Sequence, residues 1–180
     1  MGRPPRARES VLDAFEALLI SDGARGATME AVAAAAGVSK GGLLYHYASK
    51  DALETALFER MHRLVELDID EMLAAPEGII AAFVRTSQET DTPLDRSIVA
   101  ASRLAQGGHP AASASLRRVR ERWEATLRPH TRDETALQLV LLVSDGLYFN
   151  NVLAPGALPG PLPRGEDLDA LVALVERAAR

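Results

Sequence analysis

The chain of 180 residues contains no cysteine. This absence excludes disulfide bonds and thiol chemistry, and it fits the cytoplasm, which is the localisation that we expect. No uncharged apolar run reaches the roughly 18 residues that a membrane-spanning helix needs, so a membrane is not among the expected partners. The basic N-terminus also lacks the uninterrupted apolar core that follows such a stretch in a signal peptide.

Motifs that hold cofactors are missing as well. The sequence has neither a phosphate-binding loop nor the Gly-x-Gly-x-x-Gly pattern of dinucleotide-binding proteins. We therefore expect no enzyme activity, no catalytic residue, no metal and no cofactor. A β-strand pattern of useful length is also absent, whereas apolar residues recur at helical spacing along most of the chain.

Positive charge is not in excess, since the formal net charge is -5. The distribution is uneven: residues 1–50 hold six Lys and Arg against five Asp and Glu, and residues 51–180 hold fourteen against twenty. The acidic excess therefore lies in the larger, C-terminal part. Any contact of the N-terminal part with nucleic acid must be local and directed, because no broad basic field is present.

The apolar spacing predicts an all-α fold of about nine helices. We expect an N-terminal three-helix module with a helix-turn-helix over residues 1–50 and a C-terminal helical domain over residues 51–180. The expected helices cover residues 8–22, 29–36, 39–45, 49–75, 76–88, 93–106, 110–127, 133–153 and 166–179, and residues 154–165, rich in proline and glycine, are expected to form a loop. The charged side chains of the helix over residues 49–75, Glu54 and Arg60 among them, are interpreted as a solvated face.

The stretch from residue 27 to residue 53 has the pattern of two short helices joined by a tight turn. Thr28 is a good N-cap, because its hydroxyl can accept a hydrogen bond from an amide of the first turn. Gly37 can adopt the left-handed conformation that ends a helix, and Ser39 can cap the next one. Two helices joined by a short turn with glycine are the signature of a helix-turn-helix, whose second helix enters the major groove of DNA.

The second of these helices contains two glycines, Gly41 and Gly42, each of which costs a helix about 1 kcal/mol relative to alanine. One interpretation is that a bare backbone lets the helix approach bases and phosphates closely. The other is that the helix begins only near Leu43 and the glycines belong to the turn. Tyr45, His46 and Lys50 follow, and their side chains can donate hydrogen bonds to phosphate oxygens.

Residues 37–53, Gly-Val-Ser-Lys-Gly-Gly-Leu-Leu-Tyr-His-Tyr-Ala-Ser-Lys-Asp-Ala-Leu, resemble the DNA-binding motif of the tetracycline-repressor (TetR) family of transcriptional regulators. The resemblance extends back through Thr28 and covers about the first 60 residues. The chain departs from it at Leu44, where many members carry an aromatic residue. An apolar contact, for example with a thymine methyl group, is expected at that position.

The resemblance implies a regulator, most simply a repressor, that binds a palindromic operator in double-stranded DNA as a dimer and is released by a small-molecule effector. It implies that one set of residues lies towards base edges, and we expect a second set to position the protein on phosphates. The first set is Lys40, Gly41, Gly42 and Leu44. The second set is Thr28, Ser39, Tyr45, His46 and Lys50.

The last two predicted helices carry more apolar surface than one chain would cover. The helix over residues 133–153 is apolar nearly all round at its centre, and the helix over residues 166–179 has a wide apolar face. We therefore expect a homodimer in which these helices pack against their symmetry mates. The expected interface residues are Leu141, Tyr148, Leu168, Leu171, Val172 and Val175.

The resemblance also implies that the C-terminal domain binds the effector, and the helix over residues 49–75, which begins beside the DNA-binding motif, is expected to transmit its binding. Phe83, Arg103, Trp123 and Phe149 are the candidate lining residues. The aromatic and aliphatic character of this part of the chain favours a largely apolar small molecule.

A second interpretation is a helical adaptor, or an enzyme built on a helical bundle, with a purely structural helix-turn-helix. Such a protein has no need of the polar and basic side chains that are expected on one face of the motif. Those side chains are Ser39, Lys40, Tyr45, His46 and Lys50.

Overall fold

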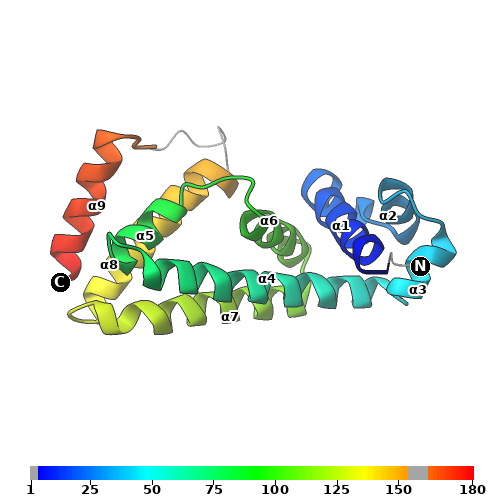
Figure 1. The fold of residues 1–180 in the computed structure, drawn as a ribbon, viewed down its shortest axis with the longest axis horizontal. Helices are drawn as coiled ribbons and strands as arrows, with labels where there is room; N and C mark the ends of the chain where they lie inside the picture. The colour runs from blue at the N-terminus through cyan, green and yellow to red at the C-terminus, as the bar shows by residue number, and fades with distance from the viewer. Residues whose placement is uncertain (1–3, 154–161) are drawn as a thin grey trace. The chain divides into compact units, whose positions relative to one another are not determined.

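A computed structural model describes residues 4–153 and 162–180, and every regular element in these ranges is helical (Figure 1). The all-α fold class is therefore confirmed. The elements are α1 (Pro4–Gly26), α2 (Met29–Ala35), α3 (Lys40–His46), α4 (Lys50–Ala74), α5 (Ile79–Thr86), α6 (Pro93–Gln106), α7 (Pro110–Leu127), η1 (Arg128–His130), α8 (Glu134–Tyr148), η2 (Phe149–Leu153) and α9 (Glu166–Ala179). None of these helices is long and apolar enough to cross a lipid bilayer.

The chain folds as two compact units that interleave in sequence. Of the described residues, the first unit comprises 4–64 and 93–118, and the second comprises 65–92, 119–153 and 162–180. The boundaries fall inside α4 and α7, so each of these helices contributes to both units. The expected division of function at residue 50 stays a prediction.

The first unit is organised around α1, which packs against α2 and against α6, while α2 packs against α3 (Figure 1). Its core consists of apolar side chains that are almost inaccessible to solvent, namely Val11, Phe15, Leu19, Leu43, Leu53, Leu57, Met61 and Leu104. These residues come from α1, α3, α4 and α6. The helix-turn-helix is therefore anchored to α1 and α4 by a shared apolar core.

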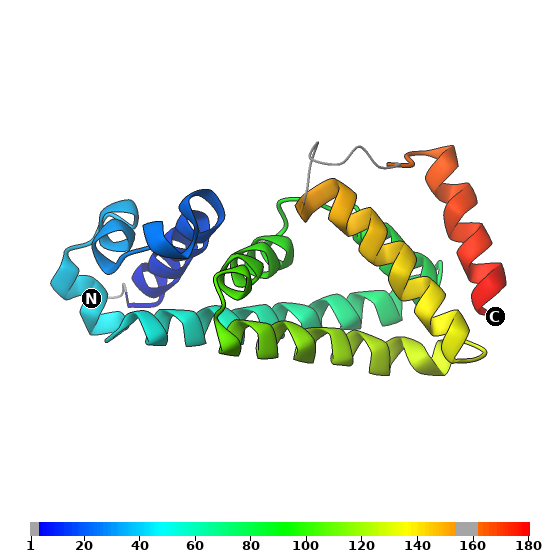
Figure 2. The same cartoon turned by 180° about the vertical axis from the view of Figure 1, so that it is seen from behind.

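The second unit is organised around α5, which packs against α8 and α9, and α8 also packs against α9 (Figure 2). Every residue from Ile79 to Val84 is buried, so α5 is covered on more than one side. α8 and α9 bury apolar side chains in the same unit, among them Leu137, Val140, Val172 and Val175.

Three predicted helices differ from the observed ones by more than one residue at an end. α1 runs from Pro4 to Gly26, with a kink at Gly23, whose positive φ of 69° interrupts the helical conformation. α5 begins at Ile79 rather than at residue 76, because Gly78 has a φ of 93° and cannot continue a helix. The α-helical geometry of α8 ends at Tyr148 and continues as a π-helical segment to Leu153. Most of the predicted loop, residues 154–161, lies outside the described residues.

Candidate nucleic-acid interface

The helix-turn-helix is held together by the caps that the sequence predicts. The Thr28 hydroxyl accepts a hydrogen bond from the Ala31 amide at 3.2 Å, and the Ser39 hydroxyl accepts one from the Gly42 amide at 3.1 Å. Gly37 has a φ of 66° in the turn, the left-handed conformation that an L side chain rarely adopts. These contacts fix the start of both helices and the turn between them.

The two glycines of α3 are helical, because the helix begins at Lys40. The interpretation that α3 begins only near Leu43 is therefore wrong. A Cβ atom added at Gly41 would meet no atom within 4 Å, whereas one at Gly42 would lie 3.3 Å from the Ser39 hydroxyl oxygen. Internal packing thus constrains Gly42, while Gly41 leaves open backbone on the exposed side of the helix.

Two large side chains of α3 project into solvent beside this open backbone. Tyr45 is 84% exposed and Leu44 is 41% exposed, whereas Leu43 between them and the turn is fully buried. The ring of His46 lies edge-on to the Tyr45 ring, with centroids 5.2 Å apart. The exposed parts of these two side chains contribute nothing to the core, so this face of α3 is available for a partner.

The two lysines of the motif have partners inside the protein. The Lys40 ammonium lies 2.5 Å from the Glu30 carboxylate, and this hydrogen bond lowers the pKa of Glu30. The Lys50 ammonium donates to the Ala24 carbonyl oxygen at 2.7 Å, which ties the start of α4 to the end of α1. An ammonium group has three donors, so Lys50 keeps donors for a further acceptor.

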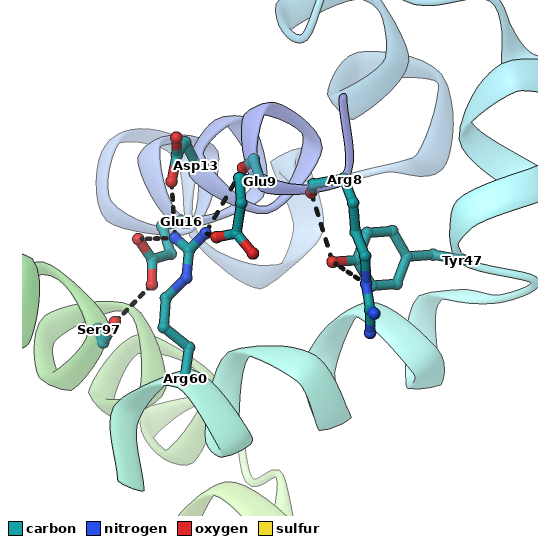
Figure 3. A network of polar contacts seen from close by, with 7 residues as sticks. All are labelled: Arg8, Glu9, Asp13, Glu16, Tyr47, Arg60 and Ser97. Atoms are coloured by element: carbon teal, nitrogen blue, oxygen red, sulfur yellow. Dashed lines mark hydrogen bonds and ion pairs between the residues drawn. The ribbon is translucent and has the colours of Figure 1, made fainter. Parts of the chain in front are cut away.

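A cation–aromatic contact joins the start of α1 to the end of α3 (Figure 3). The Arg8 guanidinium lies 5.4 Å from the centre of the Tyr47 ring, and its Nε donates to the Tyr47 hydroxyl at 3.3 Å. The hydrogen bond that Arg8 donates to Tyr47 raises the pKa of Arg8. Arg8 was not among the predicted DNA-binding residues.

Arg60 of α4 is buried and is the centre of a polar network in the first unit (Figure 3). Its guanidinium pairs with three carboxylates of α1, those of Glu9 at 2.5 Å, Asp13 at 2.7 Å and Glu16 at 3.0 Å. Burial raises the pKa of Glu16, although the hydrogen bond from Ser97 and the charge of Arg60 lower it. The interpretation of Arg60 as part of a solvated face is therefore wrong.

Glu54 of α4 is also buried, and the same interpretation is wrong for it. Its carboxylate lies 2.9 Å from Nε2 of His109, the residue before α7. The Ala112 amide in turn donates to Nδ1 of His109 at 3.3 Å. Glu54 and His109 therefore tie the start of α7 to α4 within the first unit.

Ser39 stands in a Gly-x-Ser-x-Gly pattern, from Gly37 to Gly41, which is typical of hydrolase nucleophiles. In those enzymes the serine occupies a strained turn between a strand and a helix. Here the turn joins two helices, and the hydroxyl is engaged as the cap of α3. The local structure therefore favours a capping role for Ser39.

In the second unit, two of the predicted effector-binding residues lie together. The rings of Phe83 and Trp123 meet edge to face with centroids 5.9 Å apart, and the Trp123 indole donates to Asp68 at 3.0 Å. Burial raises the pKa of Asp68 to about 6. Phe149 is an exposed residue of the same unit, and Arg103 is an exposed residue of the first unit. The lining of an effector site stays a prediction.

The predicted interface residues differ in exposure. Leu141, Val172 and Val175 are buried by their own chain, and Tyr148, Leu168 and Leu171 are half-buried. The large apolar side chains that α8 and α9 expose are others, namely Leu139, Leu142 and Leu174. The position of a dimer interface stays a prediction.

Comparison with known proteins identifies both parts of the chain. Residues 11–57 match the model described as bacterial regulatory proteins, tetR family, and residues 77–176 match that of the tetracyclin repressor-like C-terminal domain. A search of curated protein sequences finds no significant match.

Solved structures share the fold over nearly the whole chain. A transcriptional regulator of Streptomyces coelicolor A3(2), SCO7518, is 24% identical with a TM-score of 0.68, over 97% of this chain and 99% of its own. Salmonella enterica GusR is 17% identical with a TM-score of 0.70, over 99% and 98%. The multidrug-binding protein EbrR, in complex with malachite green, is 19% identical with a TM-score of 0.66, over 96% and 98%.

Proposed function

Because the chain belongs to the TetR family of bacterial transcriptional regulators, we propose that it is a cytoplasmic repressor. It binds a palindromic operator as a homodimer and leaves the DNA when a small molecule binds. The observation that carries DNA binding is the outer face of α3, where open backbone at Gly41 lies beside exposed Leu44 and Tyr45. No observation favours the adaptor or the enzyme.

In this proposal α3 enters the major groove, with Lys40, Gly41, Gly42 and Leu44 towards the base edges. The residues at its margins, namely Thr28, Ser39, Tyr45, His46 and Lys50, hold phosphates. Lys50 is already oriented by its bond to the Ala24 carbonyl, so it loses little side-chain entropy when a phosphate takes its remaining donors. Lys40 must give up its pairing with Glu30, which is exposed and therefore weak.

The experiment is a salt titration of binding to duplex DNA, using the sequence that the unaltered protein selects from a random library. Lys50→Ala is expected to weaken binding to all sequences similarly and to reduce the salt slope by about one. Lys40→Ala is expected to reduce the preference for the selected sequence, with a loss of about 1 to 3 kcal/mol in discrimination. Arg117→Ala, an exposed arginine of α7, is the control. If both lysine variants bind as the unaltered protein does, this docking is wrong.

The dimer is proposed to form through the exposed apolar side chains of α8 and α9. Leu142 and Leu174 are largely exposed on these helices, and burial of such side chains is the main driving force of association. Sedimentation should show a dimer at micromolar concentration and a monomer for Leu142→Glu with Leu174→Glu. Leu67→Glu changes an equally exposed leucine of α4 and should leave the dimer intact. A monomeric unaltered protein would contradict the proposal.

The effector is proposed to bind in the second unit near Phe83 and Trp123 and to be largely apolar. The related protein EbrR, which binds malachite green, supports a small organic ligand. Trp123 is the only tryptophan of the chain, so quenching of its fluorescence reports binding directly. A compound that quenches Trp123 should also weaken operator binding, typically by 1 to 3 kcal/mol of coupling. A compound that saturates the protein and leaves DNA affinity unchanged would contradict the coupling.

A further inference from the structure

Glu16 of α1 is buried, with 3% of its surface exposed, and its two carboxylate oxygens are bound by two different helices (Figure 3). Oε2 accepts a hydrogen bond from the Arg60 guanidinium of α4 at 3.0 Å. Oε1 accepts one from the Ser97 hydroxyl of α6 at 2.5 Å. A single carboxylate therefore fixes α1 to α4 and to α6 at once.

The other two carboxylates around Arg60 differ from Glu16 in their surroundings. The side chains of Glu9 and Asp13 are 58% and 68% exposed, so solvent screens their charges and can replace their contacts. Solvent cannot replace a lost hydrogen-bond donor of Glu16, because this carboxylate is buried. The free-energy cost of removing the carboxylate from water then remains uncompensated. The buried contacts of Glu16 are therefore the ones that depend on the positions of the helices.

Both partners of Glu16 belong to helices that are continuous with the second unit in the chain. α4 extends past Leu64 into the second unit, and α6 begins directly after the second-unit segment 65–92. α1 in turn packs against α2, which carries α3. A shift of α4 or of α6 that withdraws a donor from Glu16 thus acts on the helix that supports the DNA-binding motif.

We propose that Glu16 is a positioning residue. Its two hydrogen bonds make the position of α1, and with it that of α2 and α3, depend on the positions of both α4 and α6. DNA binding then requires the Arg60 and Ser97 donors to be in place at the same time. This inference rests on the proposed DNA-binding function. It adds a specific requirement: Arg60 and Ser97, which are not proposed to contact DNA, change the affinity for DNA through the carboxylate of Glu16.

The test compares two buried serines of the first unit. Ser97→Ala removes the donor to Glu16, and Ser115→Ala removes an equally buried hydroxyl that contacts His62 at 2.8 Å and not α1. DNA affinity is measured for the selected duplex at a temperature at which circular dichroism shows both variants folded. We expect Ser97→Ala to bind about tenfold more weakly, as the loss of a hydrogen bond to a charged group implies, and Ser115→Ala to change by less than about twofold.

A double-mutant cycle tests whether Arg60 and Ser97 act through the shared carboxylate of Glu16 or through two independent contacts. Arg60→Lys keeps the charge but loses the forked geometry that holds the carboxylates of α1. We expect the double variant with Ser97→Ala to bind no more than about twofold more weakly than the weaker single variant, because either loss already releases α1. Additive losses, or equal affinities for the two serine variants, would overturn the proposal. Asp13→Asn controls for the charge around Arg60 and should have little effect.

Amide hydrogen exchange of α2 and α3 without DNA separates this inference from the proposed function. Ser97→Ala should speed exchange over residues 29–46, and Ser115→Ala should not. If the unaltered protein selects no DNA but the exchange result holds, the proposed function is wrong and the positioning role of Glu16 stands. If DNA is bound and exchange is the same in both variants, the positioning role is wrong.

Discussion

Asp68→Asn should stabilise the protein at neutral pH. Asp68 is a partly buried carboxyl group of α4 that accepts a hydrogen bond from the Trp123 indole, and no cation among the described residues forms an ion pair with it. Burial raises its pKa from 3.8 to about 6, so the folded protein binds this proton more tightly than the unfolded chain. An amide oxygen can still accept the indole hydrogen bond, and it carries no charge to desolvate.

The magnitude follows from the linkage between pKa and stability. A shift of about two pKa units corresponds to about 3 kcal/mol between the two protonation states, because each unit is worth about 1.4 kcal/mol. For an acid with a raised pKa, the stabilisation by the proton is present below the unfolded pKa and is lost as the pH rises through about 6. Asp68→Asn should therefore raise the free energy of unfolding by up to about 3 kcal/mol near pH 7.5, and by about half of that near pH 5.

The assay is urea unfolding followed by circular dichroism at about pH 5, 6 and 7.5, with Asp70→Asn as the control. Asp70 is an exposed carboxylate on the same helix, so its variant should show little change in the free energy of unfolding at any of these pH values. An effect of Asp68→Asn that is independent of pH, or a loss of stability at pH 7.5, would refute the reasoning. The first result would mean that Asp68 does not titrate in this range, and the second that its charge is compensated.

Two further variants test the DNA-binding motif. Gly41→Ala should raise the free energy of unfolding by about 1 kcal/mol, since the added methyl group meets no atom within 4 Å, yet it should weaken operator binding if the α3 backbone approaches DNA. Urea unfolding and DNA titration of the same sample check both parts, and tighter DNA binding would contradict the close approach. Glu30→Gln removes the acidic partner of Lys40 and should strengthen DNA binding at low salt. Unchanged affinity would show that the Lys40–Glu30 pair does not compete with DNA.

The sequence predicted the helices and caps of the motif because these depend on neighbouring residues. Thr28, Gly37 and Ser39 act within a few positions of themselves, and their hydrogen bonds and dihedral angles match the prediction. The start of α5 was missed for a related reason. Pro76 is a common first residue of a helix, but the positive φ of Gly78 two residues later moves the start to Ile79.

The sequence could not predict which polar residues are buried, because burial depends on partners distant in the chain. Helical spacing separates an apolar stripe from a charged face, and Arg60 falls on the charged side of α4. In the folded protein Arg60 contacts α1, and its partner Glu16 lies 44 residues earlier. Spacing also cannot tell whether an apolar side chain is covered by its own chain, as Leu141 is, or is left exposed, as Leu142 is.

Buried ionisable groups on α1 and α4 are therefore the main feature that the structure adds. Glu16, Glu54 and Arg60 are almost inaccessible to solvent. Well-packed apolar residues in place of such buried ion pairs often leave stability unchanged or increase it, so stability alone does not account for the pairs. Unlike an apolar contact, a hydrogen-bonded ion pair needs its helices at one distance and one angle. The placement of Glu16 and Arg60 where α1 meets α4 and α6 thus agrees with a role in positioning the DNA-binding helices.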